Sequence, residues 1–410
     1  MLKYKIIFYL IILNLIFSFQ NLGAGTGRIY GKVKTTNNET FEGWIRWDKH
    51  ETFWDDYLDA TKKYFIESDW DEKILLKVYG PYKIYRDEKD FRTNSQVALQ
   101  FGHISKIIKK SSSSALIELK DGRQLFVNSA GGDIGSGNRG IEVCDLDFGK
   151  ISIDWNNFES VEFMEEKSKY RKQKNTNDVY RLYGLVKTRG EDEFKGFIMW
   201  DNDECLSTDI LNGKYRGRDM EIPFANIFII RRDSPTTSLV EMKNGTRFTL
   251  SASNDVGQGH RGIVVKDPEY GEIHIPWNDF EAIEFFERET KYLLDYNDFT
   301  GGKPLFGEVL TRDRQIFKGY ICWDNDETFT SDVLDGKLKS FDANLEFGSI
   351  YSIEYHSRRA AIIELWNGNR FELSGSNDVD DRNMGIYIMK KNGAFQKLDW
   401  EAFQKVIFSR

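Results

Sequence analysis

The stretch IPWNDFEAI, from Ile275 to Ile283, places apolar side chains at relative positions 0, 2, 5 and 8. Five other stretches share this spacing: LQFGHISKI from Leu99, IDWNNFESV from Ile153, IPFANIFII from Ile222, LEFGSIYSI from Leu345 and LDWEAFQKV from Leu398. Residues two apart lie on one face of a strand, whereas a spacing of three suits a single 3₁₀ turn. Each stretch therefore predicts a strand, a short turn and a second strand.

A longer repeat encloses these stretches in pairs. Three segments align: GKVKTTNNETFEGWIRWDKHE from Gly31, GLVKTRGEDEFKGFIMWDNDE from Gly184 and GEVLTRDRQIFKGYICWDNDE from Gly307. Trp47 and Trp200 lie 153 residues apart but Trp200 and Trp323 lie 123 apart, so the first copy carries 30 additional residues. We place this insertion at about 61–92 and expect a hairpin or a long loop there.

Polar, charged segments separate the copies. We predict domains at 27–163, 179–286 and 303–410, with linkers at 164–178 and 287–302. Each copy contains two of the short stretches and therefore two half-repeats. Because a half-repeat of about fifty residues buries only a marginal core, the two halves of each copy should share an interface.

The strand, 3₁₀ turn and strand pattern resembles the end of Src-homology-3-like and Sm-like small β-barrels. This resemblance covers most of residues 27–410, concerns the fold alone and carries no functional motif. Aromatic residues make up 14 % of the chain, and only six residues are proline. This composition suits short strands and tight turns. The predicted fold is all-β: three tandem repeats, each a pair of small barrels, with a six-bladed β-propeller as the alternative.

The N-terminus has the layout of a secretory signal peptide. Lys3 and Lys5 precede an apolar run from Ile6 to Phe19, and small residues follow at 23–25. We predict a signal peptide at 1–24 and export to the periplasm, the cell surface or the medium; an uncleaved membrane anchor is the alternative. The net charge of −8 disfavours nucleic acid as a partner, which leaves protein, peptide or glycan.

Carboxylates recur after the Trp-Asp pair of each copy. Asp48, Glu51 and Asp56 of copy one have counterparts in copies two and three, and the candidate ligand-binding residues are Asp201, Asp203, Glu204, Asp209, Asp324, Asp326, Glu327 and Asp332. Oxygen side chains at alternating positions suit Ca²⁺. Phe329, however, occupies the position where a calcium loop needs glycine. A solvated turn with capping carboxylates is the alternative.

A second polar loop recurs later in each copy, 54 residues after the Trp-Asp aspartate in copies two and three and 85 residues after it in copy one. Its candidate residues are Asp133, Arg139, Asn254, Asp255, Arg261, Asn377 and Asp378. Asp and Asn beside Gly commonly serve turn geometry, which is the alternative to a ligand site. Copy three has Met384 in place of the arginine, which argues against a repeated catalytic site.

Other recurrent residues indicate packing rather than chemistry. The two tryptophan sets share strand faces with apolar neighbours and should be core: Trp47, Trp200, Trp323, Trp155, Trp277 and Trp400. Glu118, Glu241 and Glu364 should point outward and pair across strands. Three cysteines form no disulfide framework or zinc spacing, and the five histidines never recur at one repeat position.

The sequence contains no phosphate-binding glycine loop, HExxH motif or nucleophile elbow. We therefore expect a non-catalytic repeat protein that acts as a binding or structural scaffold in the cell envelope or outside the cell. Two alternatives remain: an extracellular, carboxylate-based hydrolase of a polymer, and an adhesin-like array stiffened by calcium. No other cofactor is predicted.

Overall fold

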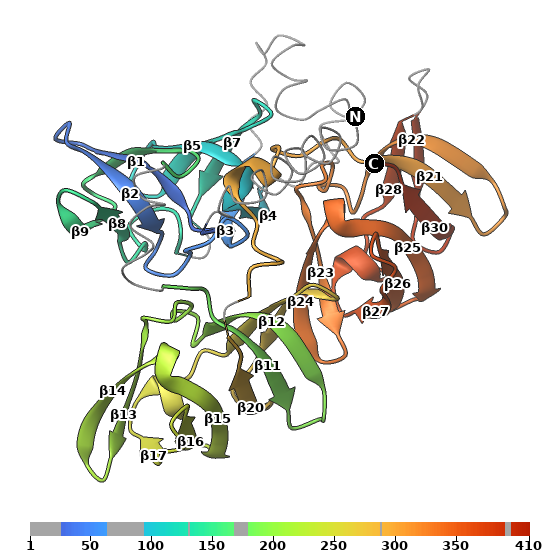
Figure 1. Ribbon diagram of the computed structural model, residues 1–410. Coiled ribbons are helices and arrows are strands. Elements are labelled where there is room, and N and C mark those ends of the chain that lie inside the picture. Colours follow the sequence, from blue (N-terminus) through green and yellow to red (C-terminus); the bar gives the residue numbers. More distant parts are fainter. Residues whose placement is uncertain (1–25, 64–93, 130–131, 168–178, 288, 390–394) are drawn as a thin grey trace, which may run out of the picture.

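A computed structural model describes residues 26–63, 94–129, 132–167, 179–287, 289–389 and 395–410. The predicted signal peptide, most of the predicted insertion and most of the first predicted linker lie outside these residues. Regular structure in the described part of the chain consists of β-strands and 3₁₀ turns, which confirms the all-β prediction (Figure 1). No helix among the described residues is long and apolar enough to cross a membrane.

The first ten strands, which we call unit 1, form an antiparallel sheet in the order β4-β3-β7-β6-β5-β10-β1-β2-β8-β9. The elements are β1 (Tyr30–Thr35), β2 (Thr40–Arg46), β3 (Tyr57–Lys63), β4 (Asn94–Gln100), η4 (Phe101–His103), β5 (Ile104–Lys109), β6 (Ser114–Leu119), β7 (Gln124–Asn128), β8 (Ile141–Asp145), β9 (Gly149–Ile153) and β10 (Phe158–Phe163).

Unit 2 repeats these pairings with β11 to β20. Its elements are β11 (Tyr183–Thr188), β12 (Glu193–Trp200), β13 (Ile210–Tyr215), β14 (Arg218–Pro223), η5 (Phe224–Asn226), β15 (Ile227–Ser234), β16 (Thr237–Met242), β17 (Arg247–Ser251), η6 (Asn254–Val256), β18 (Ile263–Asp267), β19 (Gly271–Ile275) and β20 (Phe280–Phe285).

Unit 3 repeats them again with β21 to β30. Its elements are β21 (Phe306–Thr311), β22 (Ile316–Cys322), β23 (Val333–Leu338), β24 (Phe341–Glu346), η8 (Phe347–Ser349), β25 (Ile350–Ser357), β26 (Ala360–Leu365), β27 (Arg370–Ser374), η9 (Asn377–Val379), β28 (Ile386–Met389), β29 (Phe395–Leu398) and β30 (Phe403–Phe408).

All six predicted strand, turn and strand stretches are present. In the first half of each unit the turn is a 3₁₀ helix, η4, η5 or η8, and its opening phenylalanine is buried. In the second half a hydrogen-bonded turn takes its place, with the buried Trp155, Trp277 or Trp400. The predicted local structure is therefore confirmed at all six positions.

The two halves of each unit interleave. In unit 2, β12 of the first half pairs with β18 of the second, and β13 pairs with β17. Corresponding exchanges join β2 to β8 and β22 to β28. The two halves of a unit are therefore joined by strand pairing as well as by the interface that the sequence predicted. Among the described residues, neither the 10-stranded sheet of unit 1 nor the 20-stranded sheet of units 2 and 3 closes on itself.

The recurrent tryptophans form the core of each unit, as predicted. Trp200 is fully buried and meets the ring of Phe280 edge to face at 5.3 Å between centroids. The same contact recurs between Trp323 and Phe403 at 5.3 Å. Because large aromatic side chains contribute most of the buried area in small β-structures, these rings stabilise each unit.

The three units contact one another (Figure 1). Strand β19 of unit 2 pairs with β24 of unit 3, so these units form one 20-stranded sheet with a continuous core. The predicted second linker contains η7 (Tyr296–Asp298), whose Tyr296 ring lies 4.7 Å from Trp54 of unit 1. Phe299 is buried in the core of unit 1. This linker therefore attaches unit 3 to unit 1.

Candidate functional site

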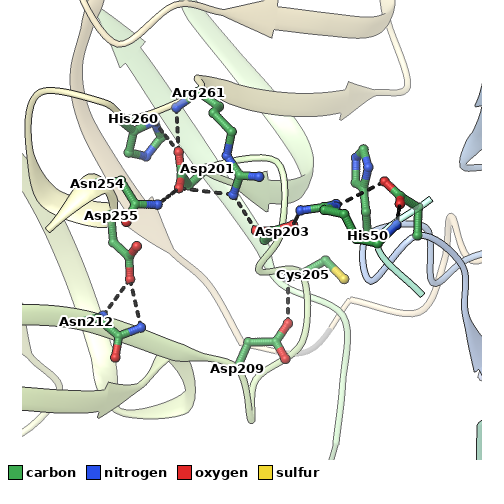
Figure 2. Close-up of polar contacts among 12 residues, drawn as sticks. His50, Asp201, Asp203, Cys205, Asp209, Asn212, Asn254, Asp255, His260 and Arg261 are labelled. Carbon is green, nitrogen blue, oxygen red and sulfur yellow. Dashed lines mark hydrogen bonds and ion pairs between the residues drawn. The ribbon is translucent and has the colours of Figure 1, made fainter. Parts of the chain in front are cut away.

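The two predicted polar loops meet in every unit, and Figure 2 shows the arrangement in unit 2. The carboxylate of Asp201 accepts hydrogen bonds from the backbone N–H of Arg261 and from the side-chain amide of Asn254. The Arg261 guanidinium also lies 3.1 Å from the second oxygen of Asp201. Residues about sixty positions apart in sequence thus surround one buried carboxylate.

The same junction recurs in the other units. In unit 1, Asp48 accepts a hydrogen bond from the backbone N–H of Arg139, whose guanidinium lies 3.1 Å from the carboxylate. In unit 3, Asp324 accepts from the backbone N–H of Met384 and from Asn377. The backbone donor survives without the arginine, so this junction is a structural feature of the repeat.

The remaining carboxylates of the first loop cap backbone amides. Asp209 Oδ2 accepts from the backbone N–H groups of Cys205 at 2.8 Å and Leu206 at 2.9 Å, and Asp56 and Asp332 do the same in their units. The expected capping role is therefore present. The expectation of a solvated turn is wrong for Asp201 and Asp324, which are fully buried, and for the buried Asp48, Asp56 and Asp332, whereas other carboxylates of these loops, such as Asp203, are partly exposed.

The aspartate of the second loop links the two loops to the core. In unit 2, Asp255 accepts a backbone hydrogen bond from Asn212 at 2.6 Å, and its own carbonyl accepts from Trp200 Nε1 at 2.9 Å. Asp133 and Asp378 make equivalent bonds in units 1 and 3. The neighbouring His260 stacks on Trp277 at 4.5 Å, and burial lowers the pKa of its imidazole to about 4.

A buried pair of carboxyl groups lies beneath each loop junction. Burial, reinforced by the charge of Asp255, raises the pKa of Glu204 to about 9. Burial and the charge of Glu51 likewise raise the pKa of Asp133 to about 9, and burial with Asp378 raises the pKa of Glu327. In each pair, burial favours the neutral form of the carboxyl group, and the charge of the neighbouring carboxylate adds to this effect.

The acidic loop of unit 2 is contacted by two arginines of unit 1. Arg46 binds Asp209 through two hydrogen bonds, of 2.8 and 3.2 Å, and donates to the Asp203 carbonyl at 2.6 Å. Arg139 lies 2.9 Å from the Asp203 carboxylate. The loop that the sequence predicts as a ligand site is therefore bound by a neighbouring part of the same chain.

The other two acidic loops also lie at joints between units. In unit 1, Asp55 binds Arg181 of unit 2 at 2.8 Å. In unit 3, Ser331 accepts a hydrogen bond from Arg123 of unit 1 at 3.1 Å, and the Arg123 guanidinium lies 3.3 Å from the centre of the Phe329 ring. Every repeated acidic loop thus meets a cationic side chain from another unit.

The cationic residues at these joints were not predicted from the sequence, although the repeat alignment contained an indication of them. The position of Arg46 is held by Met199 and Cys322 in the other copies, and the position of Lys266 by Cys144 and Met389. Lys266 lies 3.5 Å from Asp56 of unit 1. A charged residue that interrupts an otherwise apolar repeat position marks the contact specific to that copy.

An acidic pocket of about 520 Å³ lies between units 1 and 3. Its wall contains the carboxyl groups of Asp59, Glu327, Asp335 and Asp342, and no lysine or arginine. Burial, reinforced by the charge of Glu272, raises the pKa of Asp59 to about 6. The Oε2 atom of Glu327 is buried and has no hydrogen-bond partner among the described residues. Unit 1 and unit 3 together therefore form a cavity lined by carboxyl groups, of which Asp342 is paired with Lys337 at 2.5 Å.

In the part of the chain that the structure describes, no group of three or more His, Cys, Asp or Glu side chains is placed to hold a metal ion. Four of the predicted calcium residues, Asp201, Asp209, Asp324 and Asp332, accept hydrogen bonds from amides, and Asp203 pairs with arginines. Glu204, Asp326 and Glu327 each keep one buried carboxyl oxygen without a hydrogen-bond partner among the described residues. No protein family model matches the chain, and no curated protein and no solved structure is significantly similar to it.

Proposed function

We propose that the chain is an exported, non-catalytic repeat protein that serves as a binding or structural scaffold in the cell envelope or outside the cell. One observation carries this proposal: the repeated acidic loops cap backbone amides and meet cations of neighbouring units, as Asp209 meets Arg46. Residues used in this way stabilise an arrangement of units. They are not free to carry a repeated reaction.

We further propose that each unit is one predicted repeat and consists of two Src-homology-3-like modules that exchange strands. One module has the strand order β20-β11-β12-β18-β19, with two strands from the first half of the unit and three from the second. The other module has the order β15-β16-β17-β13-β14, with three strands from the first half and two from the second. The pairing of β15 with β20 joins the two modules. This exchange favours paired modules over the six separate blades of a propeller.

The partner that fits this scaffold is a cationic segment of a protein or peptide bound in the acidic pocket between units 1 and 3. Four carboxyl groups line the cavity: Asp342 pairs with Lys337, whereas Asp59 and Asp335 have no lysine or arginine partner among the described residues. A bound lysine or arginine side chain would relieve the repulsion that this arrangement creates. The pocket is formed from two units, so it depends on the scaffold as a whole.

The test is binding of a fluorescent oligolysine peptide to the full chain at low ionic strength. Replacing both Asp59 and Asp335 with asparagine should weaken binding by on the order of tenfold or more, because the pocket loses two charges while side-chain shape is kept. Glu308→Gln, an exposed carboxylate on unit 3, is the control and should leave affinity unchanged. Equal affinities for all three chains would refute the pocket as the binding site.

A carboxylate-based polymer hydrolase remains the second candidate, favoured by the same pocket. Asp59 has a pKa of about 6, close to the range of a general acid, and lines the pocket with Glu327. A screen of extracellular polysaccharides and peptides distinguishes the two functions. Turnover that disappears in Asp59→Asn would establish the hydrolase, and silence across the screen would leave the binding function.

A further inference from the structure

Units 2 and 3 are joined by strand pairing, and the contact has a defined register. Glu272 of β19 lies opposite Asn344 of β24, Ile273 opposite Ala343, and His274 opposite Asp342. Ile273 and Ala343 are fully buried in this contact. Edge strands of one unit therefore extend the sheet of another within this chain.

Aromatic side chains cover the same joint. The ring of Tyr270, beside β19, lies 5.4 Å from that of Phe371 in unit 3, with an interplanar angle of 71°. Phe194 meets Phe341 at 5.6 Å and 83°. Edge-to-face contacts of this kind add to the energy of strand pairing. The joint thus has three parts: a strand pair, an apolar pair in its centre and an aromatic cover.

The equivalent edges of units 1 and 2 have no paired strand in the described part of the chain. Repeat alignment places β9 of unit 1 where β19 lies, and β14 of unit 2 where β24 lies. Among the described residues, each of these strands has one paired neighbour and an outer edge without one. Ile151 replaces Ile273 and Met220 replaces Ala343, and both are partly exposed instead of fully buried.

Part of the aromatic cover is also present on these edges, although Arg218 takes the place of Phe341 on unit 2. Phe148 takes the place of Tyr270 and is 69 % exposed, while its ring meets Phe41, the counterpart of Phe194, at 5.9 Å. On unit 2, Phe248 takes the place of Phe371 and lies partly buried beside Tyr215 at 5.2 Å. An exposed aromatic at a free strand edge is a typical feature of a protein contact surface.

The two free edges complement each other in charge. In the register of the β19 and β24 joint, Lys150 would lie opposite Glu221, Ile151 opposite Met220, and Ser152 opposite Asp219. Lys150 and Glu221 are both exposed, and Lys150 also pairs with Glu142 of its own unit at 2.7 Å. An apolar pair with opposite charges on one side of it is favourable across antiparallel strands.

We propose that β9 of one chain pairs with β14 of a second copy of this chain, in the register of the β19 and β24 joint. In Figure 1 the two strands lie at the outer margins of different units. Each chain therefore offers one donor edge and one acceptor edge. Such a contact between unlike surfaces builds a closed ring or a longer head-to-tail assembly.

The test is sedimentation velocity of the full mature chain over a range of concentrations, with charge reversal at the new contact. Wild-type protein should sediment faster as concentration rises. Lys150→Glu and Glu221→Lys should each weaken assembly by on the order of tenfold, because the cross-strand pair changes from attraction to repulsion. An equimolar mixture of the two variants should recover assembly, since each then meets an opposite charge on the other.

Lys397→Glu is the matched control. It reverses a charge on β29, the strand of unit 3 that corresponds to β9 of unit 1. No aromatic residue of unit 3 takes the place of Phe148 beside this strand. This variant should assemble like the wild type, and all variants should retain the wild-type melting temperature. A wild-type chain that stays monomeric, single variants that assemble normally, or a mixture that fails to assemble would each overturn the proposal.

Discussion

The joint between units 1 and 2 can be tested by replacing Arg46 with methionine. Methionine occupies the matching position of unit 2, Met199, so the local strand accepts this side chain. The replacement removes both hydrogen bonds to Asp209 and the bond to the Asp203 carbonyl, and it leaves the strand pairing of unit 1 unchanged. The variant therefore tests the contact between units and not the fold of one unit.

The expected loss follows from the burial of the pair. The side chain of Arg46 is 20 % exposed and that of Asp209 is 14 % exposed. Removing one member of a fully buried ion pair costs about 3–5 kcal/mol. Because Asp209 keeps its two backbone N–H donors, we expect a smaller loss, about 2–3 kcal/mol in the free energy of unfolding.

Urea unfolding followed by tryptophan fluorescence measures this loss. Lys34→Met is the control, because the Lys34 and Glu159 side chains are 41 % and 40 % exposed and such a pair contributes about 0–1 kcal/mol. Adding Asp209→Asn to Arg46→Met should recover part of the loss, since it removes the uncompensated charge. If Arg46→Met costs no more than Lys34→Met, the joint does not stabilise the chain.

Three further results are expected. Glu204 has a pKa of about 9 in the folded chain, whereas its ordinary pKa is 4.5. Between pH 4.5 and pH 9, the folded state therefore keeps a proton on Glu204 that the unfolded state has released. The free energy of unfolding should therefore fall as pH rises through this window; Glu204→Gln should flatten the fall in urea titrations, and unchanged slopes would contradict this. Gly196→Ala should prevent stable folding, because its Cβ would lie 2.0 Å from the carbonyl of Lys266, whereas Gly190→Ala, with nothing closer than 3.7 Å, should leave the melting temperature nearly unchanged. Calcium and a chelator should both leave the melting temperature unchanged, because the loop carboxylates already accept hydrogen bonds; a shift with calcium would support the metal hypothesis.

Local periodicity was sufficient for the secondary structure and for the core. The spacing in IPWNDFEAI specifies which side chains share a strand face, and Trp277 is buried as that spacing predicts. Repetition was also sufficient for part of the candidate site. Asp201 and Asn254 recur together in copies two and three, and in both copies they meet at the same loop junction.

The partners of those loops were not predictable from local pattern. Arg46 and Asp209 are 163 positions apart, and nothing near either residue specifies the other. The interleaving of β12 with β18 is equally hidden, because any strand with one apolar face can pair with several others and the shared core selects among them.

The strands β9 and β19 illustrate where the sequence stops and the tertiary structure begins. Repeat alignment makes them equivalent, and both end in an isoleucine that enters the core, Ile153 and Ile275. Among the described residues, only β19 has a neighbour on its outer edge, because the placement of the units brings β24 beside it and places no described strand beside β9. Short-range periodicity sets the faces of a strand, whereas the docking of whole units determines which edges are occupied.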